Sequence, residues 1–145
     1  MKKIGLSAIM FAMLSFASVN KSTEHIEHIH PETLQDFVQS ITPDSISTLV
    51  MAMIAVESNW NINASSATND HGLMQINKRY WGNQFDFERI YEPEYNVKAG
   101  IYILNQCLAR SGGDIRLALR YYNGGSRYPN VINRKHKEMF GKKLF

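Results

Sequence analysis

The chain has 145 residues, enough for one domain, with 44% hydrophobic and 20% charged residues, which is typical of a globular protein and excludes a disordered one. Its formal net charge of +3 is too small to indicate binding to nucleic acid through overall charge. The single cysteine excludes an intramolecular disulfide.

The first residues are typical of a secretory signal peptide. Lys2 and Lys3 precede an apolar run over residues 4–16, and small residues suited to cleavage follow. The run is too short to span a bilayer comfortably, and no later stretch is long and apolar enough for a membrane helix. We therefore expect residues 1–19 to be a signal peptide and the protein to be periplasmic or secreted. A retained N-terminal anchor is the alternative.

Residues 20–30 are predicted to be a polar connector before a domain at 31–145. The connector contains His25, His28 and His30, a spacing that a metal ion could use. No histidine or cysteine cluster downstream completes such a site, so we expect no metal.

Two helices are predicted next. An apolar stripe from Leu34 to Ile41 predicts a helix that starts near residue 31. Thr42, followed by Pro43 and Asp44, predicts a second helix start with Thr42 as the cap. That second helix is apolar on most sides up to Glu57, which is typical of the buried centre of a domain.

The rest of the chain predicts an all-α domain. Residues 59–71 are rich in Asn, Ser, Thr and Asp and predict a structured loop, with a short hairpin inside it as an open alternative. Residues 78–93 are aromatic and irregular. Cys107 follows Ile103 by four residues and is expected to be buried. The further helices are predicted at 94–110, from Asp114 to Asn123, and at about 130–140.

Glu57 is a charged residue at the end of the most apolar helix, directly before a polar loop. Apolar neighbours and the negative end of the helix dipole should both raise its pKa. A carboxyl that stays protonated near neutral pH can act as a general acid. Its position alone fits a glutamate at a solvent edge equally well, so the surrounding motifs must decide.

Three ordered blocks resemble the signature of the lytic transglycosylase family related to goose-type lysozyme. The first begins with Glu57-Ser58 and continues through Ser66 to Gly72-Leu-Met-Gln-Ile76; the second is YNVKAG at 95–100 and the third is YNGG at 122–125. The resemblance implies a small helical domain of the goose-lysozyme type, within the α+β lysozyme-like superfamily. It also implies that the protein acts on peptidoglycan glycan strands without a cofactor.

Site residues carry over from the resemblance position by position. Glu57 matches the catalytic glutamate. Ser66 matches a serine near the substrate N-acetyl group, and Tyr122 matches a tyrosine that hydrogen-bonds near the catalytic carboxyl or the sugar. The other expected substrate contacts are Gln75, Met74 and Asn123 within these blocks, and Asn77 directly after the first block.

The form TNDHGLMQIN at residues 68–77 is similar to the small specialised transglycosylases of secretion, conjugation and pilus systems. Where the broad family often has Pro and a Gly-Ala pair, this chain has Ile62 and Asn69-Asp70. The similarity implies an enzyme that opens local gaps in the wall, with components of such a machine as partners.

Two routes of cleavage share Glu57, and the resemblance favours the transglycosylase, which cleaves the bond between N-acetylmuramic acid and N-acetylglucosamine, over a hydrolase. A transglycosylase needs one carboxylate and forms a 1,6-anhydro sugar without consuming water. A goose-type lysozyme-like hydrolase of the inverting kind needs a second carboxylate to activate water, and Asp70 is the candidate. Asp70 fits a turn residue at least as well. A non-catalytic peptidoglycan-binding module is the third alternative.

Overall fold

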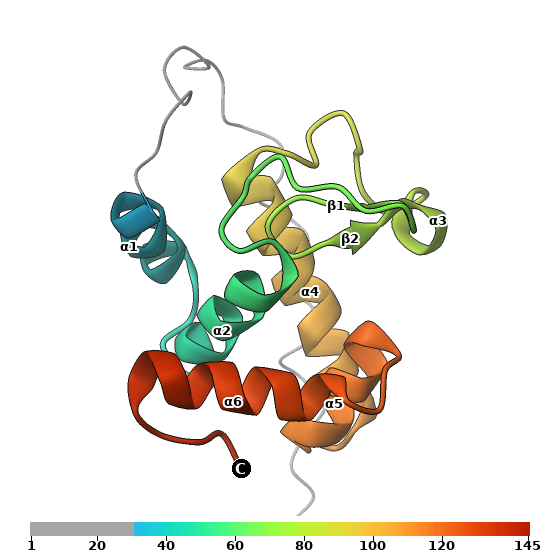
Figure 1. The fold of residues 1–145 in the computed structure, drawn as a ribbon. Helices are drawn as coiled ribbons and strands as arrows, with labels where there is room; N and C mark the ends of the chain where they lie inside the picture. The colour runs from blue at the N-terminus through green and yellow to red at the C-terminus, as the bar shows by residue number, and fades with distance from the viewer. Residues whose placement is uncertain (1–30) are drawn as a thin grey trace, which may run out of the picture.

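Six helices and one short hairpin make up residues 31–145, the part of the chain that the computed structural model describes (Figure 1). The predicted signal peptide and connector lie outside these residues. The elements in chain order are α1 (Pro31–Ile41), α2 (Ser47–Glu57), β1 (Asp70–His71), β2 (Ile76–Asn77), α3 (Lys78–Trp81), α4 (Pro93–Arg110), α5 (Ile115–Asn123) and α6 (Tyr128–Phe140).

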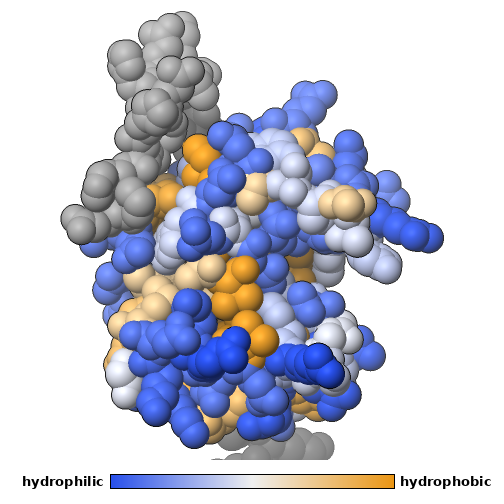
Figure 2. Space-filling model, viewed as in Figure 1, coloured by the Kyte–Doolittle hydropathy of each residue, from blue (hydrophilic) through white to orange (hydrophobic). Residues whose placement is uncertain are grey.

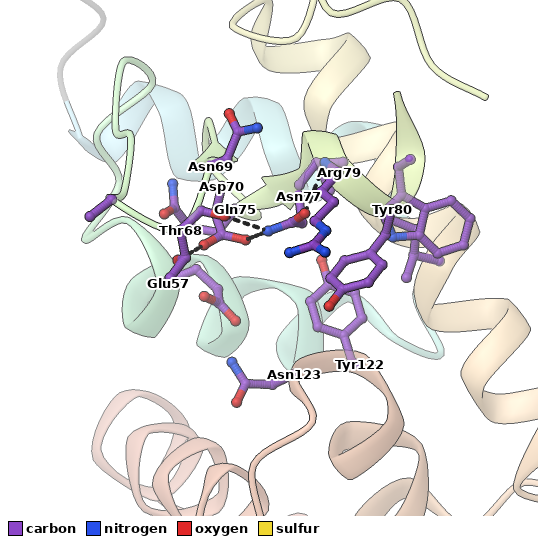
Figure 3. A pocket seen from close by; sticks show the side chains of 14 residues that line it. Glu57, Thr68, Asn69, Asp70, Gln75, Asn77, Arg79, Tyr80, Tyr122 and Asn123 are labelled. Carbon is purple, nitrogen blue, oxygen red and sulfur yellow. Dashed lines mark hydrogen bonds between the residues drawn. The ribbon is translucent and has the colours of Figure 1, made fainter. Parts of the chain in front are cut away.

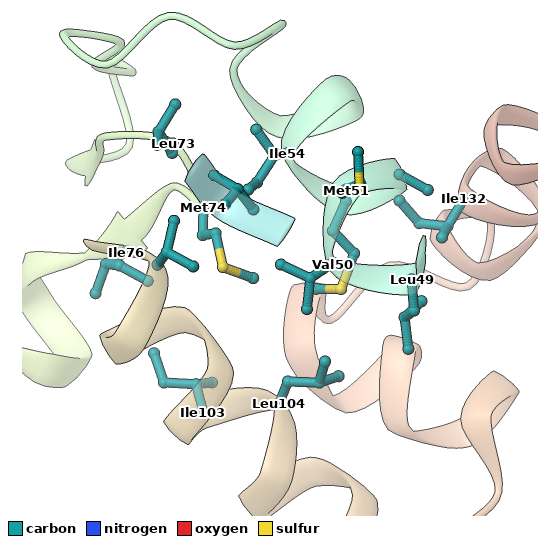
Figure 4. Close-up of a cluster of buried hydrophobic side chains, with 14 of the residues drawn as sticks. Leu49, Val50, Met51, Ile54, Leu73, Met74, Ile76, Ile103, Leu104 and Ile132 are labelled. Atoms are coloured by element: carbon teal, nitrogen blue, oxygen red, sulfur yellow. The ribbon is translucent and has the colours of Figure 1, made fainter. Parts of the chain in front are cut away.

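Helix α2 lies at the centre of the domain, and every side chain from Leu49 to Ile54 is buried. It packs against α1 and α6, while α4 packs against α5. Figure 4 shows side chains of α2, α4, α6 and the hairpin region meeting in one hydrophobic cluster. This arrangement confirms the predicted all-α domain with a buried second helix, and Cys107 is buried as expected.

The predicted cap of the second helix is wrong. The Thr42 hydroxyl donates to the Val38 carbonyl at 2.6 Å, so Thr42 is buried at the end of α1. A turn at residues 44–46 follows, and α2 begins at Ser47 without a side-chain cap. Hydrophobic packing of α2 outweighs the missing cap, which is worth only about 1 kcal/mol.

The later helices have the predicted boundary signals. The Asp114 carboxylate accepts a hydrogen bond from the Leu117 amide at 2.9 Å and caps α5. Gly124 ends α5 with a left-handed φ of 80°, a conformation that glycine adopts without steric cost. The last helix starts at Tyr128, slightly earlier than predicted, so Tyr128 lies in its first turn.

The short hairpin considered inside residues 59–71 is present in part, because an isolated antiparallel bridge joins Ser65 to His71. β1 and β2 pair antiparallel, with Asp70 opposite Asn77, so the two named strands continue the pairing beyond residue 71. The turn between them contains Gly72 at φ 76° and Gln75 at φ 50°. α3 follows directly, in a segment predicted to be irregular.

Within residues 31–145, no helix combines the length and the apolar character needed to cross a membrane. Figure 2 shows that the face seen in Figure 1 is mostly hydrophilic, with a narrow hydrophobic strip near its middle.

Candidate active site

A cleft of about 690 Å³ lies between the hairpin with α3 on one side and the end of α5 on the other. Figure 3 shows its lining side chains. Six of the predicted site residues line it: Glu57, Asp70, Gln75, Asn77, Tyr122 and Asn123. Ser66 and Met74 do not line the cleft, and the remaining lining residues are Ala67, Thr68, Asn69, Ile76, Arg79, Tyr80, Trp81 and Ile103.

Glu57 is the last residue of α2 and brings a carboxyl to the floor of the cleft from the apolar centre of the fold. Its pKa is raised from 4.5 to about 7, because burial and the negative charge of Asp70 raise it more than the Tyr128 hydrogen bond lowers it. Near neutral pH the carboxyl therefore exists in both protonation states, so it can give up a proton and take one back.

Tyr128 is a site residue that the sequence motifs did not indicate. Its hydroxyl donates to Glu57 Oε1 at 2.5 Å. Burial and the nearby charge of Glu57 raise the Tyr128 pKa well above its usual value, so the phenol keeps its proton and acts as the donor. The bond holds Oε1, which leaves Oε2 as the carboxyl oxygen available to a substrate.

Asp70 is held as an ionised carboxylate by neutral donors. Oδ2 accepts hydrogen bonds from the Ser66 hydroxyl at 2.6 Å and from the Thr68 hydroxyl, and Oδ1 accepts from the Asn77 amide at 2.7 Å. Burial raises the Asp70 pKa, but these bonds together with the charge of His71 lower it overall. Ser66, which does not line the cleft itself, therefore contributes to the site through Asp70.

Asn77 joins the carboxylate of Asp70 to helix α3. Its amide nitrogen also donates to the Thr68 carbonyl at 2.8 Å, and its Oδ1 accepts from the Arg79 amide at 3.0 Å. Asn77 is thus the N-cap of α3. The network fixes where α3 starts and carries Arg79, Tyr80 and Trp81 to one wall of the cleft.

Met74 has a structural position, because its side chain is fully buried. Its carbonyl accepts a hydrogen bond from the Tyr122 hydroxyl at 3.0 Å, and its amide donates to Asn96 Oδ1 at 2.8 Å. The Tyr122 hydroxyl is therefore bonded to the backbone beside the cleft and not to the Glu57 carboxyl. Neighbouring Gln75 donates through Nε2 to the carbonyls of Ala64 and Gly72, which leaves its Oε1 for a ligand.

No group of three or more His, Cys, Asp or Glu side chains is placed to hold a metal ion anywhere in residues 31–145. The chemistry available in the cleft is that of a half-protonated carboxyl, an ionised carboxylate, the Arg79 guanidinium and several amides and hydroxyls. Such a set can protonate a leaving oxygen and bind a polar polymer.

The comparisons with known proteins agree with this chemistry. The family model described as the Transglycosylase SLT domain matches residues 39–144, an interval that contains every residue lining the cleft. No solved structure matches the chain. Because the match covers more than half of the sequence, the chain belongs to the family of proteins with a transglycosylase SLT domain, whose substrate is peptidoglycan and whose fold is helical and lysozyme-like.

Proposed function

We propose that this protein is a peptidoglycan lytic transglycosylase that cleaves the β-1,4 bond between N-acetylmuramic acid and N-acetylglucosamine and forms 1,6-anhydro-N-acetylmuramic acid. The observation that carries the proposal is the Glu57 carboxyl. It ends a buried helix, faces a cleft in a domain of the transglycosylase SLT family, and has a pKa of about 7.

In the first step, protonated Glu57 donates its proton through Oε2 to the glycosidic oxygen, and the bond from that oxygen to C1 of the muramyl sugar breaks. The N-acetyl carbonyl of the same sugar stabilises the positive charge at C1, as in substrate-assisted glycosidases. The Tyr128 hydrogen bond stabilises the carboxylate that forms and keeps its orientation.

In the second step, the Glu57 carboxylate takes the proton from the muramyl C6 hydroxyl, whose oxygen attacks C1. The anhydro ring closes, Glu57 is protonated again, and no water is consumed. We assign Gln75 and Asn123 to substrate positioning, because both line the cleft and the Gln75 Oε1 accepts no hydrogen bond among the described residues.

Glu57→Gln tests the proposed acid/base. Cleavage of purified peptidoglycan should fall at least about 100-fold, since a positioned general acid/base contributes roughly 10²–10⁴-fold. Glu88→Gln is the matched control, because Glu88 is exposed and lies outside the cleft, and it should keep normal activity. A folded Glu57→Gln protein with normal activity would refute the role of Glu57.

The product distinguishes the two routes directly. Mass spectrometry of the released muropeptides should show anhydro products, each one water lighter than the product of hydrolysis. Products of the hydrolysed mass alone would refute the transglycosylase reaction and leave the peptidoglycan-cleaving role of Glu57 in place.

A lysozyme-like hydrolase is the second candidate, because Asp70 lines the same cleft and interacts electrostatically with Glu57. The three hydrogen bonds on Asp70 lower its pKa, and a carboxylate with a lowered pKa is a poor general base for water. We therefore expect Asp70→Asn to retain anhydro product. If Asp70→Asn removed activity as completely as Glu57→Gln, hydrolysis would be favoured.

We further propose that the protein is exported through residues 1–19 and opens local gaps in the wall for a secretion, conjugation or pilus machine. The apolar N-terminal run and the similarity of residues 68–77 to such enzymes support this. Cell fractionation and the mass of the exported chain test the export. Assembly of the machine in a strain that carries only Glu57→Gln tests the role, and normal assembly would contradict it.

A further inference from the structure

We propose that Arg79 recognises a carboxylate on the 3-O-lactyl arm of the muramyl sugar, and so makes the cleft selective for muramyl glycans over carboxylate-free N-acetylglucosamine polymers. The proposal rests on the proposed peptidoglycan-cleaving function and adds a specificity-determining residue to it. Arg79 lies outside the three sequence blocks that resemble the transglycosylase family.

The charges of the cleft lining leave Arg79 as its single basic residue, opposed to the acidic Glu57 and Asp70. Arg79 forms no ion pair, and its guanidinium donates no hydrogen bond, among the described residues. Figure 3 shows the guanidinium directed into the cleft. Its five donors are therefore free for a ligand.

Both carboxylates of the cleft already accept hydrogen bonds from neutral partners. Asp70 accepts hydrogen bonds on both oxygens, including one from Asn77, and Glu57 accepts from Tyr128. Neither carboxylate lies within ion-pair distance of Arg79. The site thus keeps a cation and two anions apart, which is the arrangement expected when the cation binds an anion from outside.

The position of Arg79 is fixed by the same network that holds Asp70. The Arg79 amide donates to Asn77 Oδ1, and the Asn77 amide group donates to Asp70. The backbone at Arg79 is therefore anchored beside the proposed reaction centre, and its guanidinium has no internal partner among the described residues.

Tyr80 supplies a neutral surface on the same wall. Its side chain is 77% exposed and lines the cleft, and no ring contact or hydrogen bond involves it within the described residues. An exposed tyrosine offers a rigid amphipathic surface on which a sugar ring can lie. A sugar on Tyr80 with an acidic substituent beside Arg79 matches a glycan in which every second sugar carries a lactyl arm.

The carboxylate can come from two sources, the lactyl group itself when the peptide is absent, or the stem peptide attached to it. Three β-1,4-linked tetrasaccharides separate these sources: an N-acetylglucosamine tetramer, the alternating muramyl tetramer without peptide, and the same tetramer with stem peptides. Binding is measured in Glu57→Gln protein, so that no ligand is cleaved and the result does not depend on turnover.

We expect Glu57→Gln protein to bind at least one muramyl ligand more tightly than the N-acetylglucosamine tetramer, and Arg79→Gln to reduce that preference by about 10-fold, equivalent to about 1.4 kcal/mol. Binding of the carboxylate-free tetramer should not change. Lys78→Gln is the matched control, because exposed Lys78 is the neighbouring cation on α3 and does not line the cleft. It removes the same charge and should preserve the preference.

Preference for the peptide-free muramyl tetramer identifies the lactyl carboxylate, and preference only for the peptide-bearing one identifies the stem peptide. An unchanged preference in Arg79→Gln, no preference before the substitution, or an equal loss in Lys78→Gln overturns the proposal. Failure of the proposed function is recognised separately, as an absence of cleavage products from the protein with Glu57 intact.

Discussion

Two neighbours act in opposite directions on the carboxyl of Glu57. The charge of Asp70 raises the Glu57 pKa, while the hydrogen bond from Tyr128 lowers it, and burial is the largest influence. The resulting pKa of about 7 suits a group that must act as an acid in one step and as a base in the next. Burial and the two neighbours together set the pH range in which one carboxyl can do both.

Tyr128→Phe should raise the Glu57 pKa further, because the lost hydrogen bond favours the charged carboxylate. Glu57 then stays protonated to higher pH, so the alkaline limb of the pH profile of kcat/KM should move to higher pH. Tyr122→Phe is the control, because the Tyr122 hydroxyl is bonded to the Met74 carbonyl and not to Glu57. An alkaline limb that stays in place or moves to lower pH in Tyr128→Phe would contradict the assignment.

The sequence predicted several cleft residues but not Tyr128, for a physical reason. Glu57, Asp70 and Gln75 lie in or beside contiguous sequence blocks, so local spacing was enough to bring them together. Tyr128 is 71 positions from its partner, and an aromatic residue in the first turn of a helix has many ordinary roles. Only the packing of α6 against α2 brings its hydroxyl to Glu57.

At the scale of elements, the three sequence blocks that resemble the transglycosylase family form one frame around Met74. Asn96 of α4 accepts from the Met74 amide and donates to the carbonyls of His71 and Ile90. A Cβ on Gly72 would lie 2.2 Å from the Asn96 amide nitrogen, so this glycine is required by close approach. The frame holds the turn that carries Gln75, which means that much of the motif supports the site structurally.

Gly100→Ala tests this frame. A Cβ at position 100 would lie 2.2 Å from Met74 Sδ, so Met74 must shift, and we expect a loss of about 1–3 kcal/mol in the free energy of unfolding. Denaturant unfolding measures it. Asn105→Ala is the control, because Asn105 is an exposed position of the same helix. Alanine there should not lower the free energy of unfolding.

In a Met74→Ala background, Gly100→Ala should lower the free energy of unfolding by less. The sulfur and terminal methyl of Met74, which the new Cβ would meet, are then absent. An equal cost in both backgrounds would show that the loss at Gly100 does not arise from contact with Met74.

Helices and strands were predicted correctly where their boundary residues lie close together in the sequence. They were missed where the structure depends on residues that are distant in the sequence. The helix from Asp114 has a cap and a glycine stop within its own sequence, and its boundaries were predicted. The two-residue strands of the hairpin are too short to show the alternation of apolar and polar residues that identifies a strand in a sequence. Their pairing depends on left-handed residues such as Asn69 and Gln75 and on Asn96, which is distant in the sequence.

For the whole molecule, a carboxyl with a raised pKa makes stability depend on pH. The Glu57 pKa is 4.5 when unperturbed and about 7 in the folded protein. As the pH rises through this window, the unfolded chain loses the proton while the folded chain keeps it. The free energy of unfolding therefore falls between about pH 4.5 and 7 and stays reduced above pH 7. The catalytic group is thus expected to destabilise the fold at the pH where it works.

Glu57→Gln should remove this pH-dependent loss of stability. Glutamine has a similar shape, can still accept the hydrogen bond from Tyr128 and does not ionise. After allowance for solvent screening at a partly exposed group, we expect the variant to be more stable than the parent by on the order of 2 kcal/mol at pH 8. The difference should disappear near pH 4. Glu88→Gln, at an exposed position, should show no such pH-dependent gain in denaturant unfolding. A Glu57→Gln protein with the same stability as the parent at pH 8 would show that burial does not raise the pKa of Glu57. The proposed role of Glu57 as an acid near neutral pH would then lose its physical basis.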